Sequence, residues 1–346
     1  GLEWLAGYVA LRHLQRPDLA AAHFARFGAA VETPISLGRA GYWLGRAQEA
    51  LGDTAAARAA YAKAAGYQTS FYGLLAAQRA GLPFDTALAA QGPRPDWRGA
   101  PFTVSSVYRA GILLLAAGED ALAERFLTHL AESLDPPQLA RLGALLDEVE
   151  EPHIAVMIGK RAARRGLTVP APYYPLHPMS GVRWPVPTEL ALAIARRESE
   201  FDPRVVSGAG ARGLMQVLPG TAREVAGRLG LTYDHARLLD DWTYNAQLGA
   251  AYLAELVDRF DGNPVLVAAA YNAGPSRPLR WIEELGDPRD PEVDVVDWIE
   301  SIPFSETRNY VMRVTESLPV YRARLGQAPH PVPFVEELKG GTLSGG

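Results

Sequence analysis

The sequence contains no cysteine. This absence excludes disulfide bonds, thiolate catalysis and the zinc or iron–sulfur sites that cysteine ligands build. The seven histidines are scattered along the chain, and no two of them are spaced i, i+4, as two ligands on one helix face would be. We therefore expect no metal site. A chain without thiols also suits an oxidising compartment, where a free thiol is a liability.

Long hydrophobic runs and an excess of basic residues are absent as well. The longest apolar candidate runs from Ile112 to Ala117, whereas a membrane helix needs about 18 apolar residues. The 34 basic and 39 acidic residues give a net charge of −5, which argues against a dedicated nucleic-acid-binding protein. No signal peptide or initiator methionine is visible. We expect a mature or truncated fragment without a membrane-spanning segment.

The first half of the chain has almost none of the alternating β-branched runs that mark strands, and it is rich in Ala, Leu and Arg. A helix hairpin expected at residues 2–31 recurs at residues 38–66. The stretch Trp4 to Tyr8 resembles Tyr42 to Arg46 at an offset of 38. Repeats of this length with aromatic and small residues are typical of a TPR-like α-solenoid.

Helical patterns continue beyond the repeat and are then interrupted by proline. The expected helices are Ser105–Ala117, Glu119–Ser133, Pro137–Val149 and Pro152–Gly166. Residues 168–187 are so dense in proline that we expect extended chain and a domain boundary there. The predicted division of the 346 residues is a superhelical part at 1–170, a second domain at 171–330 and a tail at 331–346, with residues 339–346 disordered.

One carboxylate continues an apolar stripe in the second half. A helix is expected to begin with Thr188 as its N-cap, and Leu190, Ile194 and Glu198 then share one face of that helix. A glutamate buried without a partner has its pKa raised toward neutrality, which is what a general acid needs. The other interpretation is a frayed last turn with Glu198 in solvent. Periodicity alone leaves both open.

Two further segments have the composition of ligand-binding turns. Residues 207–216 form a glycine-rich loop between helices, and glycine lets the backbone approach a ligand closely. The stretch Ala268 to Pro275 ends a helix at Gly-Pro, next to Tyr271 and Asn272. These two side chains project into a cleft or only cap the helix, and spacing does not decide between the two.

Five segments of the second half stand in a distinctive order. They are Ala195–Ser199, Gly210–Gln216, Asn245 with Leu248–Leu253, Ala270–Pro275 and Trp298–Val311. Together they resemble the soluble lytic transglycosylases, enzymes that cut bacterial peptidoglycan. In the first half, Phe71–Arg79 and Tyr42–Ala47 resemble the superhelical domain of the same family. The resemblance covers nearly the whole chain.

This resemblance implies an all-α fold, with a lysozyme-like α-domain following an α-superhelical scaffold. The family cleaves the β-1,4 bond between N-acetylmuramic acid and N-acetylglucosamine and leaves a 1,6-anhydro ring on the muramic residue. It relies on one carboxyl group where ordinary glycosidases use two. Glu198 would protonate the glycosidic oxygen and then take a proton from the 6-hydroxyl, while the substrate's acetamido group replaces the second carboxylate. No metal or nucleotide cofactor is implied.

The resemblance also implies the residues of a saccharide groove. They are Ser207, Gly213, Leu214, Met215, Gln216, Tyr271, Asn272, Glu300 and Tyr310. Ser207 would lie near the acetamido group or the sugar hydroxyls, and Tyr271 near the catalytic carboxyl. Glu300 would bind substrate or orient its neighbours, with an N-cap or a salt bridge to Arg308 as the alternative. Asp202 is expected to be structural, in a turn.

Two other functions remain open from the residues. A goose-type-lysozyme-like muramidase would hydrolyse the same bond, but it needs a positioned water and usually a further carboxylate. A non-catalytic adaptor would only bind glycan strands. In each case the expected partner is peptidoglycan, so we expect an exported, periplasmic protein whose superhelical part is suited to docking other cell-wall proteins.

Overall fold

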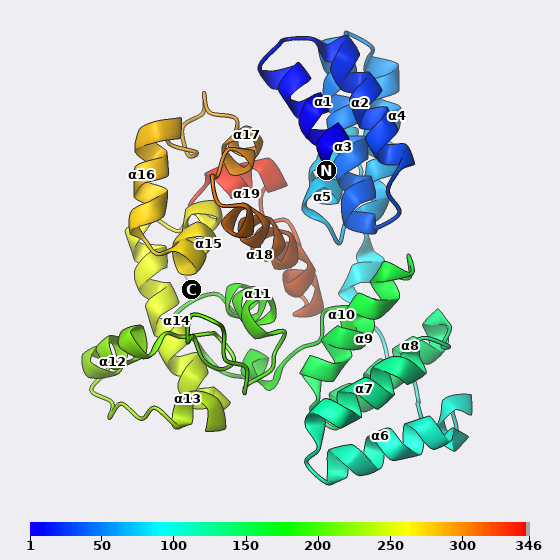
Figure 1. The fold of residues 1–346 in the computed structure, drawn as a ribbon, viewed down its shortest axis with the longest axis vertical. Coiled ribbons are helices and arrows are strands. Elements are labelled where there is room, and N and C mark those ends of the chain that lie inside the picture. Colours follow the sequence, from blue (N-terminus) through cyan, green and yellow to red (C-terminus); the bar gives the residue numbers. More distant parts are fainter. Residues whose placement is uncertain (344–346) are drawn as a thin grey trace.

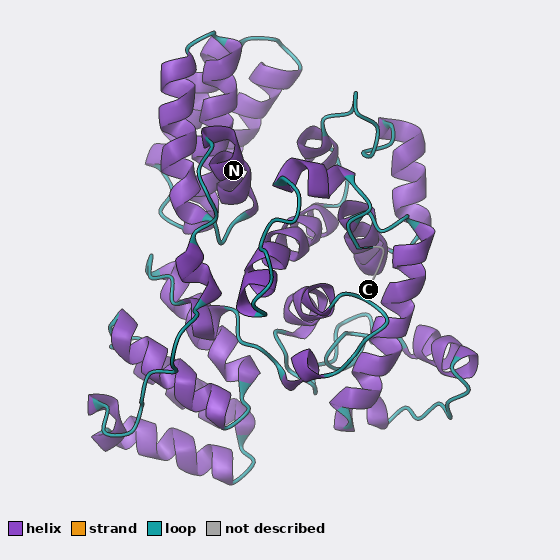
Figure 2. Cartoon of the chain, turned by 180° about the vertical axis from the view of Figure 1, so that it is seen from behind, coloured by secondary structure: helices purple, strands orange, loops and turns teal. Residues whose placement is uncertain are grey.

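The computed structural model describes residues 1–343, and most of them are in helices (Figures 1 and 2). In this range there is no strand, although two isolated β-bridges join Arg212 to Val206 and to Val217. The predicted all-α class is therefore confirmed. No helix of residues 1–343 is both long and apolar enough to cross a membrane.

The N-terminal helices stack in sequence order, each against the next (blue in Figure 1). They are α1 (Leu2–Arg12), α2 (Pro17–Ala29), α3 (Pro34–Ala50), α4 (Thr54–Ala64) and α5 (Phe71–Ala80), with the 3-10 turn η1 (Ala65–Tyr67) before α5. The predicted repeat of helix hairpins is confirmed, although its second copy begins four residues earlier than expected.

A contact between glycine and an aromatic ring builds both hairpins. A Cβ atom on Gly7 of α1 would lie 2.6 Å from the ring of Phe24 on α2. A Cβ atom on Gly45 of α3 would lie 2.4 Å from the ring of Tyr61 on α4. Any larger residue would push the two helices apart, so the repeated glycine sets how closely each hairpin packs.

The middle of the chain forms four further helices after the short turns η2 (Thr86–Ala89) and η3 (Pro101–Val104). They are α6 (Ser106–Ala116), α7 (Asp120–Ala131), α8 (Pro136–Glu148) and α9 (Pro152–Arg164). The predicted helices of this region are confirmed, with ends that differ by at most two residues. Their buried leucines and isoleucines form a hydrophobic cluster of their own.

The proline-rich segment 168–187 departs from the prediction. We expected no helix there, but it contains α10 (Pro170–Tyr173) and the 3-10 turn η4 (Pro178–Gly181). Each element begins with its proline. At the first helical position the missing N–H carries no penalty and the fixed φ is already helical, so proline density alone does not exclude short helices.

The C-terminal half places a central helix among longer neighbours (Figure 1). The elements are α11 (Thr188–Ser199), α12 (Pro219–Arg228), α13 (Arg237–Asp240), α14 (Trp242–Arg259), α15 (Pro264–Ala273), α16 (Ser276–Leu285), α17 (Val295–Glu300), α18 (Ser305–Arg324) and α19 (Phe334–Lys339). Helix α11 packs along α18, and α18 also packs against α15. The apolar face of α11 is therefore covered from Leu190 to Ala195.

The expected C-terminal tail is folded as far as the structure describes it. Phe334 and Leu338 of α19 are buried, and so is Leu343. The Leu343 amide donates to the carbonyl of Gly262 at 3.1 Å. The prediction of a disordered stretch from residue 339 is therefore wrong up to residue 343, because apolar side chains there find a place in the core. Residues 344–346 lie outside the described residues.

The buried apolar residues do not divide at residue 170. One cluster comprises residues 100–169 only, while the other joins the first five helices to the C-terminal half. In this second cluster the Phe71 ring lies 5.8 Å from that of Phe334. The packing thus groups α1–α5 with α11–α19, with α6–α9 as a separate layer.

Acidic side chains of the C-terminal half fasten it to the N-terminal helices. Asp294 lies 2.9 Å from Arg46, and Asp297 pairs with Arg12. Asp297 and Glu300 are spaced i, i+3 on α17, and Asp294 caps the start of this helix. Further along, Glu316 of α18 accepts a hydrogen bond of 2.6 Å from the Phe71 amide at the start of α5. These contacts hold α17 and α18 against the solenoid.

Candidate active site

Glu198 occupies the last turn of α11. Ile194 lies one turn before Glu198 on the same face and Leu190 lies two turns before it, and both are completely buried. Glu198 itself is half-buried. The apolar stripe predicted for this helix is confirmed, and the carboxylate stands where the stripe reaches the surface. The prediction of Thr188 as the N-cap is wrong. Thr188 is the first helical residue, and no side chain caps the helix at Pro187.

A tyrosine from a distant part of the chain contacts this carboxylate. The hydroxyl of Tyr310, on α18, donates a hydrogen bond of 2.7 Å to Oε1 of Glu198. The Tyr310 side chain is buried, and the guanidinium of Arg197 lies 5.6 Å from its ring centre. Glu198 thus has one neutral donor and no paired cation among the described residues.

This environment raises the pKa of Glu198 to about 7 from an ordinary value of 4.5. Burial is the largest cause, since it disfavours the charged form. The Tyr310 hydrogen bond and the charge of Arg197 lower this pKa, whereas the charge of Glu306 raises it. Near neutral pH Glu198 therefore exists in both protonation states, which suits a group that first gives a proton and then takes one.

The turn after Glu198 is held from another layer of the molecule. Glu200 and Phe201 both have positive φ, which reverses the chain sharply at the end of α11. Lys160 of α9 pairs with the carboxylate of Glu200, and His153 of the same helix lies 2.9 Å from the Glu200 carbonyl oxygen through Nδ1. Helix α9 therefore helps to fix the end of the helix that carries Glu198.

One asparagine anchors the glycine-rich loop that follows α11 in the sequence. Asn245 on α14 accepts from the Met215 amide at 2.9 Å and donates to the carbonyls of Arg212 and Leu238 at 2.8 and 2.9 Å. At Gly213 φ is +72°, and a Cβ atom would lie 2.1 Å from the Leu238 carbonyl oxygen. Only glycine fits at this position.

Two residues of this loop that were predicted to line a saccharide groove have no solvent-exposed surface. Leu214 and Met215 are completely buried, and a Cβ atom on Gly249 would lie 2.7 Å from the Met215 sulfur. Ser199 donates to the Leu214 carbonyl at 2.7 Å, which ties the loop to α11. Neither side chain reaches the surface, so the structure places both in the core and offers neither for direct contact with a saccharide.

Gln216 and Ser207 are partly exposed and remain candidates for direct contact. The Gln216 amide donates to the carbonyls of Val205 and Gly213 at 3.0 Å each, which leaves its carbonyl oxygen as an acceptor. The Ser207 hydroxyl accepts from the Ala211 amide at 3.0 Å, which leaves its proton to donate. Each side chain is fixed by one hydrogen-bonding group and offers another.

Tyr271 and Asn272 follow at the end of α15. The Tyr271 hydroxyl donates to the Met215 carbonyl at 2.8 Å, and burial, followed by the charge of Glu198, raises its pKa. Asn272 accepts a hydrogen bond of 2.7 Å from the Thr307 hydroxyl on α18. The structure thus brings Tyr271 into the electrostatic field of Glu198 and uses Asn272 to join α15 to α18.

Glu300 lies at the interface with the solenoid. Its side chain is completely covered, and Arg39 of α3 approaches its Oε1 to 2.6 Å. Tyr72 of α5 donates to the same oxygen, and Arg308 lies 3.7 Å from the other. A fully covered carboxylate has no surface for substrate. Of the roles considered, the contacts fit orientation of neighbours and the salt bridge to Arg308.

Sequence reasoning missed Glu306, whose charge acts on Glu198. Glu306 and Tyr310 are spaced i, i+4 at the start of α18, so they lie on the same face of that helix. Glu306 is exposed, whereas Glu300 is covered. Extending the helical spacing from Tyr310 through the last motif would have selected Glu306 over Glu300. Asp202, by contrast, is structural as expected, since it accepts from the Arg204 amide at 2.8 Å.

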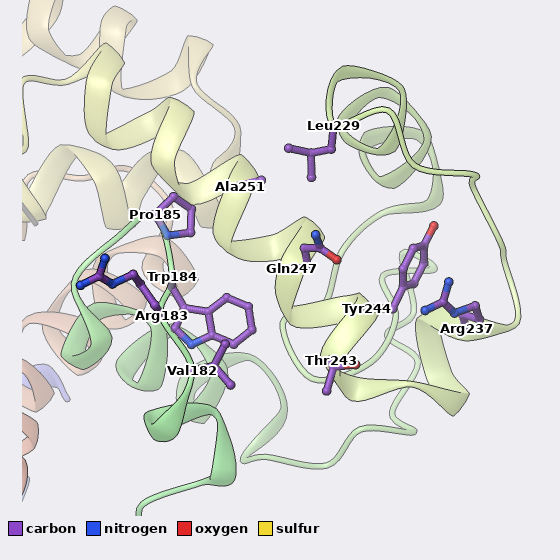
Figure 3. A pocket seen from close by; sticks show the side chains of 10 residues that line it. All are labelled: Val182, Arg183, Trp184, Pro185, Leu229, Arg237, Thr243, Tyr244, Gln247 and Ala251. Carbon is purple, nitrogen blue, oxygen red and sulfur yellow. The ribbon is translucent and has the colours of Figure 1, made fainter.

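A cavity of about 380 Å³ elsewhere on this half is distinct from the site (Figure 3). Trp184, Leu229, Tyr244 and Gln247 are among its lining residues, and none of the predicted site residues is. Trp184 precedes the start of α11, whereas Glu198 is at its end. Among residues 1–343 there is likewise no group of three or more His, Asp or Glu residues that could hold a metal ion.

The fold and the site define a class: an all-α, lysozyme-like domain with a single glutamate of raised pKa at the end of its central helix. Comparison with known proteins shows which family this domain resembles. Residues 178–292 match the model of the transglycosylase SLT domain. The predicted resemblance is confirmed.

Individual relatives agree with this assignment. The chain is 39% identical over 145 residues to the soluble lytic murein transglycosylase of Escherichia coli K12, covering 42% of this chain and 22% of that protein. It is 42% identical over 140 residues to the Salmonella typhimurium protein of the same name, covering 40% and 21%. The chain thus spans about a fifth of the length of these curated relatives.

Solved structures extend the likeness to almost the whole chain. The crystal structure of the 70-kDa soluble lytic transglycosylase of Escherichia coli superposes with a TM-score of 0.72 at 27% identity, covering 95% of this chain and 52% of that one. The lytic transglycosylase Slt of Pseudomonas aeruginosa, solved as an inactive mutant, gives 0.71 at 28%, covering 98% and 53%. The likeness to these structures therefore includes both the N-terminal helices and the C-terminal half of this chain.

Proposed function

We propose that this chain is a lytic transglycosylase that cleaves peptidoglycan glycan strands, with Glu198 as its proton-transfer group. The observation that carries the proposal is the pKa of Glu198, raised to about 7 by burial, with the Tyr310 hydroxyl 2.7 Å away. The similarity to soluble lytic murein transglycosylases supports this proposal.

In the proposed reaction the protonated Glu198 gives its proton to the oxygen of the β-1,4 bond. The bond from this oxygen to C1 of the muramic residue breaks, and the carbonyl oxygen of the 2-acetamido group bonds to C1. The Glu198 carboxylate then takes the proton of the 6-hydroxyl, whose oxygen displaces the acetamido oxygen at C1. Glu198 ends protonated, and no water is consumed.

The chain's own residues divide this work. Tyr310 keeps the Glu198 carboxyl in place and stabilises its ionised form between the two proton transfers. Ser207 and Gln216 offer a free donor and a free acceptor, respectively, to the acetamido group or to sugar hydroxyls. Glu198 only transfers protons in this scheme, so the substrate's acetamido group takes the place of a second carboxylate as the nucleophile at C1.

The test is a digest of purified peptidoglycan with the products analysed by mass spectrometry, for the wild type and for Glu198→Gln. We expect products one water lighter than hydrolytic muropeptides, and a rate lower by about a thousandfold in Glu198→Gln, because general acid–base catalysis contributes ~100- to 10,000-fold. Glu284→Gln, at an exposed position on α16, is the matched control and should keep full activity.

Other products would select another function. Reducing-end products would overturn the transglycosylase proposal in favour of a hydrolase. No products from the wild type, with retained binding to glycan strands, would favour a non-catalytic adaptor. The rate should also fall as the pH rises through about 7, because only the protonated Glu198 can act as the acid.

The cellular setting follows from the substrate. Peptidoglycan lies outside the cytoplasmic membrane, so we propose that the protein acts in the periplasm. The solenoid helices α1–α5 and the layer α6–α9 are proposed to offer surfaces for other cell-wall proteins, as stacked helix pairs often do.

A further inference from the structure

A cavity of about 750 Å³ lies where three parts of the molecule meet, away from Glu198. Its walls come from the connecting segment 87–95, from α8 and α10, and from the C-terminal end of α18. Figures 1 and 2 both show that end of α18 close to α10. The cavity therefore borders the solenoid, the middle helices and the SLT-family half at once.

Arg324, in the last turn of α18, lines this cavity without a partner. Its Nε atom is buried and has no hydrogen-bond acceptor, and no ion pair involves Arg324 among residues 1–343. Burial lowers its pKa, and the charges of Tyr321 and Asp147 partly offset this effect. A guanidinium does not lose its proton in a protein, so it offers a permanent positive charge to an anionic group that enters the cavity.

The one acidic residue of the wall, Asp147, forms its ion pair with another arginine. Arg94 and Asp147 both line the cavity and pair with each other at 2.8 Å. The three ionisable side chains of the wall thus leave one net positive charge, on Arg324. The carbonyl end of α18 favours a cation nearby, but a helix end carries only about half an elementary charge.

The rest of the wall combines small apolar side chains with polar groups. Ala140 and Ala144 of α8 line the cavity together with Val169 and Pro170, and Gln91 and Ser180 line it as well. Such a surface accommodates methyl-sized side chains and offers hydrogen bonds to a peptide backbone. The combination fits a ligand that has a carboxylate at one end and small aliphatic groups behind it.

We propose that this cavity binds the carboxylate end of a short peptide with small side chains, with Arg324 as the partner of the carboxylate. The planar guanidinium matches a carboxylate through two parallel hydrogen bonds. The identification of the natural ligand as a stem peptide of peptidoglycan rests on the proposed function, whereas binding of a simple peptide to the cavity does not.

The probe is N-acetyl-D-alanyl-D-alanine, titrated into the full chain by calorimetry, with its C-terminal amide as the uncharged counterpart. We expect a dissociation constant on the order of 1 mM for the acid. Arg324→Gln should weaken binding by about tenfold or more, because hydrogen bonds to charged groups exceed neutral ones. Arg109→Gln, at an exposed position on α6, removes the same charge elsewhere and should change nothing.

A second variant tests the cavity itself and keeps Arg324. Ala140→Leu adds a larger side chain to a lining position, and leucine suits the helix. It should weaken binding of the acid, while peptidoglycan cleavage stays at the wild-type level. Equal binding of acid and amide, or unchanged binding in Arg324→Gln, would overturn the proposal.

Two further outcomes would also overturn it. One is absence of binding to the wild type at 20-fold above the expected dissociation constant. The other is inorganic phosphate competing as well as the peptide acid does, which would make the site a general anion site. Because none of these titrations measures cleavage, failure of this proposal is distinguishable from failure of the proposed function.

Discussion

Two glutamates of the C-terminal half differ in the groups that surround their carboxylates. Glu198 lies at the end of α11, and Glu300 lies at the interface with the solenoid. Glu300 is completely covered, yet two arginines and a tyrosine hydroxyl surround its carboxylate. Glu198 is less covered, but a single tyrosine hydroxyl is its hydrogen-bond partner. Partners, more than depth, decide what a buried carboxylate does, because a nearby cation offsets the loss of hydration and a neutral donor does so only in part.

Glu316 stands between these two cases. It is buried, with Arg313 at 3.1 Å and the Phe71 amide at 2.6 Å, and burial raises its pKa to about 7 all the same. A raised pKa therefore does not mark a catalytic group by itself. What separates Glu198 from Glu316 is access, since only Glu198 stands at the surface where a substrate can reach it.

Removing Arg39, the cation that pairs with Glu300 at the solenoid interface, should have the largest effect on stability. Arg39→Ala leaves the covered Glu300 without its 2.6 Å partner, and breaking a buried pair typically costs several kcal/mol. Because Arg39 is 25% exposed, we expect the free energy of unfolding to fall by about 3 kcal/mol, at the lower end of that range. Chemical denaturation at pH 7 measures this.

Arg58→Ala, at an exposed position on α4, is the control and should change stability by less than about 0.5 kcal/mol. The double variant Arg39→Ala with Glu300→Gln should recover part of the loss, because it also removes the unpaired charge. A similarly small effect of Arg39→Ala and Arg58→Ala would show that the interface does not depend on this pair.

The next prediction concerns Glu316 and pH. Its pKa is about 7 in the folded protein against 4.5 ordinarily, so its contribution to stability is complete below pH 4.5 and is lost as the pH rises through about 7. Glu316→Gln does not titrate, so it should gain about 3 kcal/mol relative to wild type between these pH values. Denaturation curves at several pH values test this. Parallel pH profiles for the two proteins would contradict it.

The smallest effect is predicted for removal of the Tyr310 hydroxyl, which donates a hydrogen bond to Glu198. Tyr310→Phe removes a hydrogen bond that lowers the pKa of Glu198, so this pKa should rise further, by about 1 unit. The basic limb of the pH–rate profile for muropeptide release should therefore move to higher pH. Tyr252→Phe, which packs on Tyr271 without bonding Glu198, is the control. An unmoved limb would show that Tyr310 does not tune the acid.

Local sequence was sufficient for the elements and for the central residue. The repeated hairpins rest on glycine–aromatic pairs such as Gly7 with Phe24, whose two members lie in neighbouring helices. The period of α11 placed Glu198 on its apolar stripe. The helix ends in the region 102–170 followed from proline, aspartate and glycine at turns. These are short-range effects, and the identity of nearby residues determines them.

The errors arose where distant segments meet. Residues 339–343 have the composition of a tail, and only the core beside Gly262 gives Leu343 a place to pack. Leu214 and Met215 belong to a groove motif, yet their burial depends on α14. Glu300 and Glu306 are both acids of one motif, and the solenoid decides that the first is covered and the second exposed.

The sequence by itself determined the all-α class, the order of its helices and the acid Glu198, because helical period and turn residues act within a few positions. Only the tertiary structure decided how strongly Glu198 holds its proton. Burial in the folded protein is the largest cause of the raised pKa. Helix α18, more than 100 residues away in sequence, contributes the Tyr310 hydrogen bond, which lowers this pKa, and the charge of Glu306, which raises it. A pKa depends on every charge and on the water around the group, and folding alone brings these together.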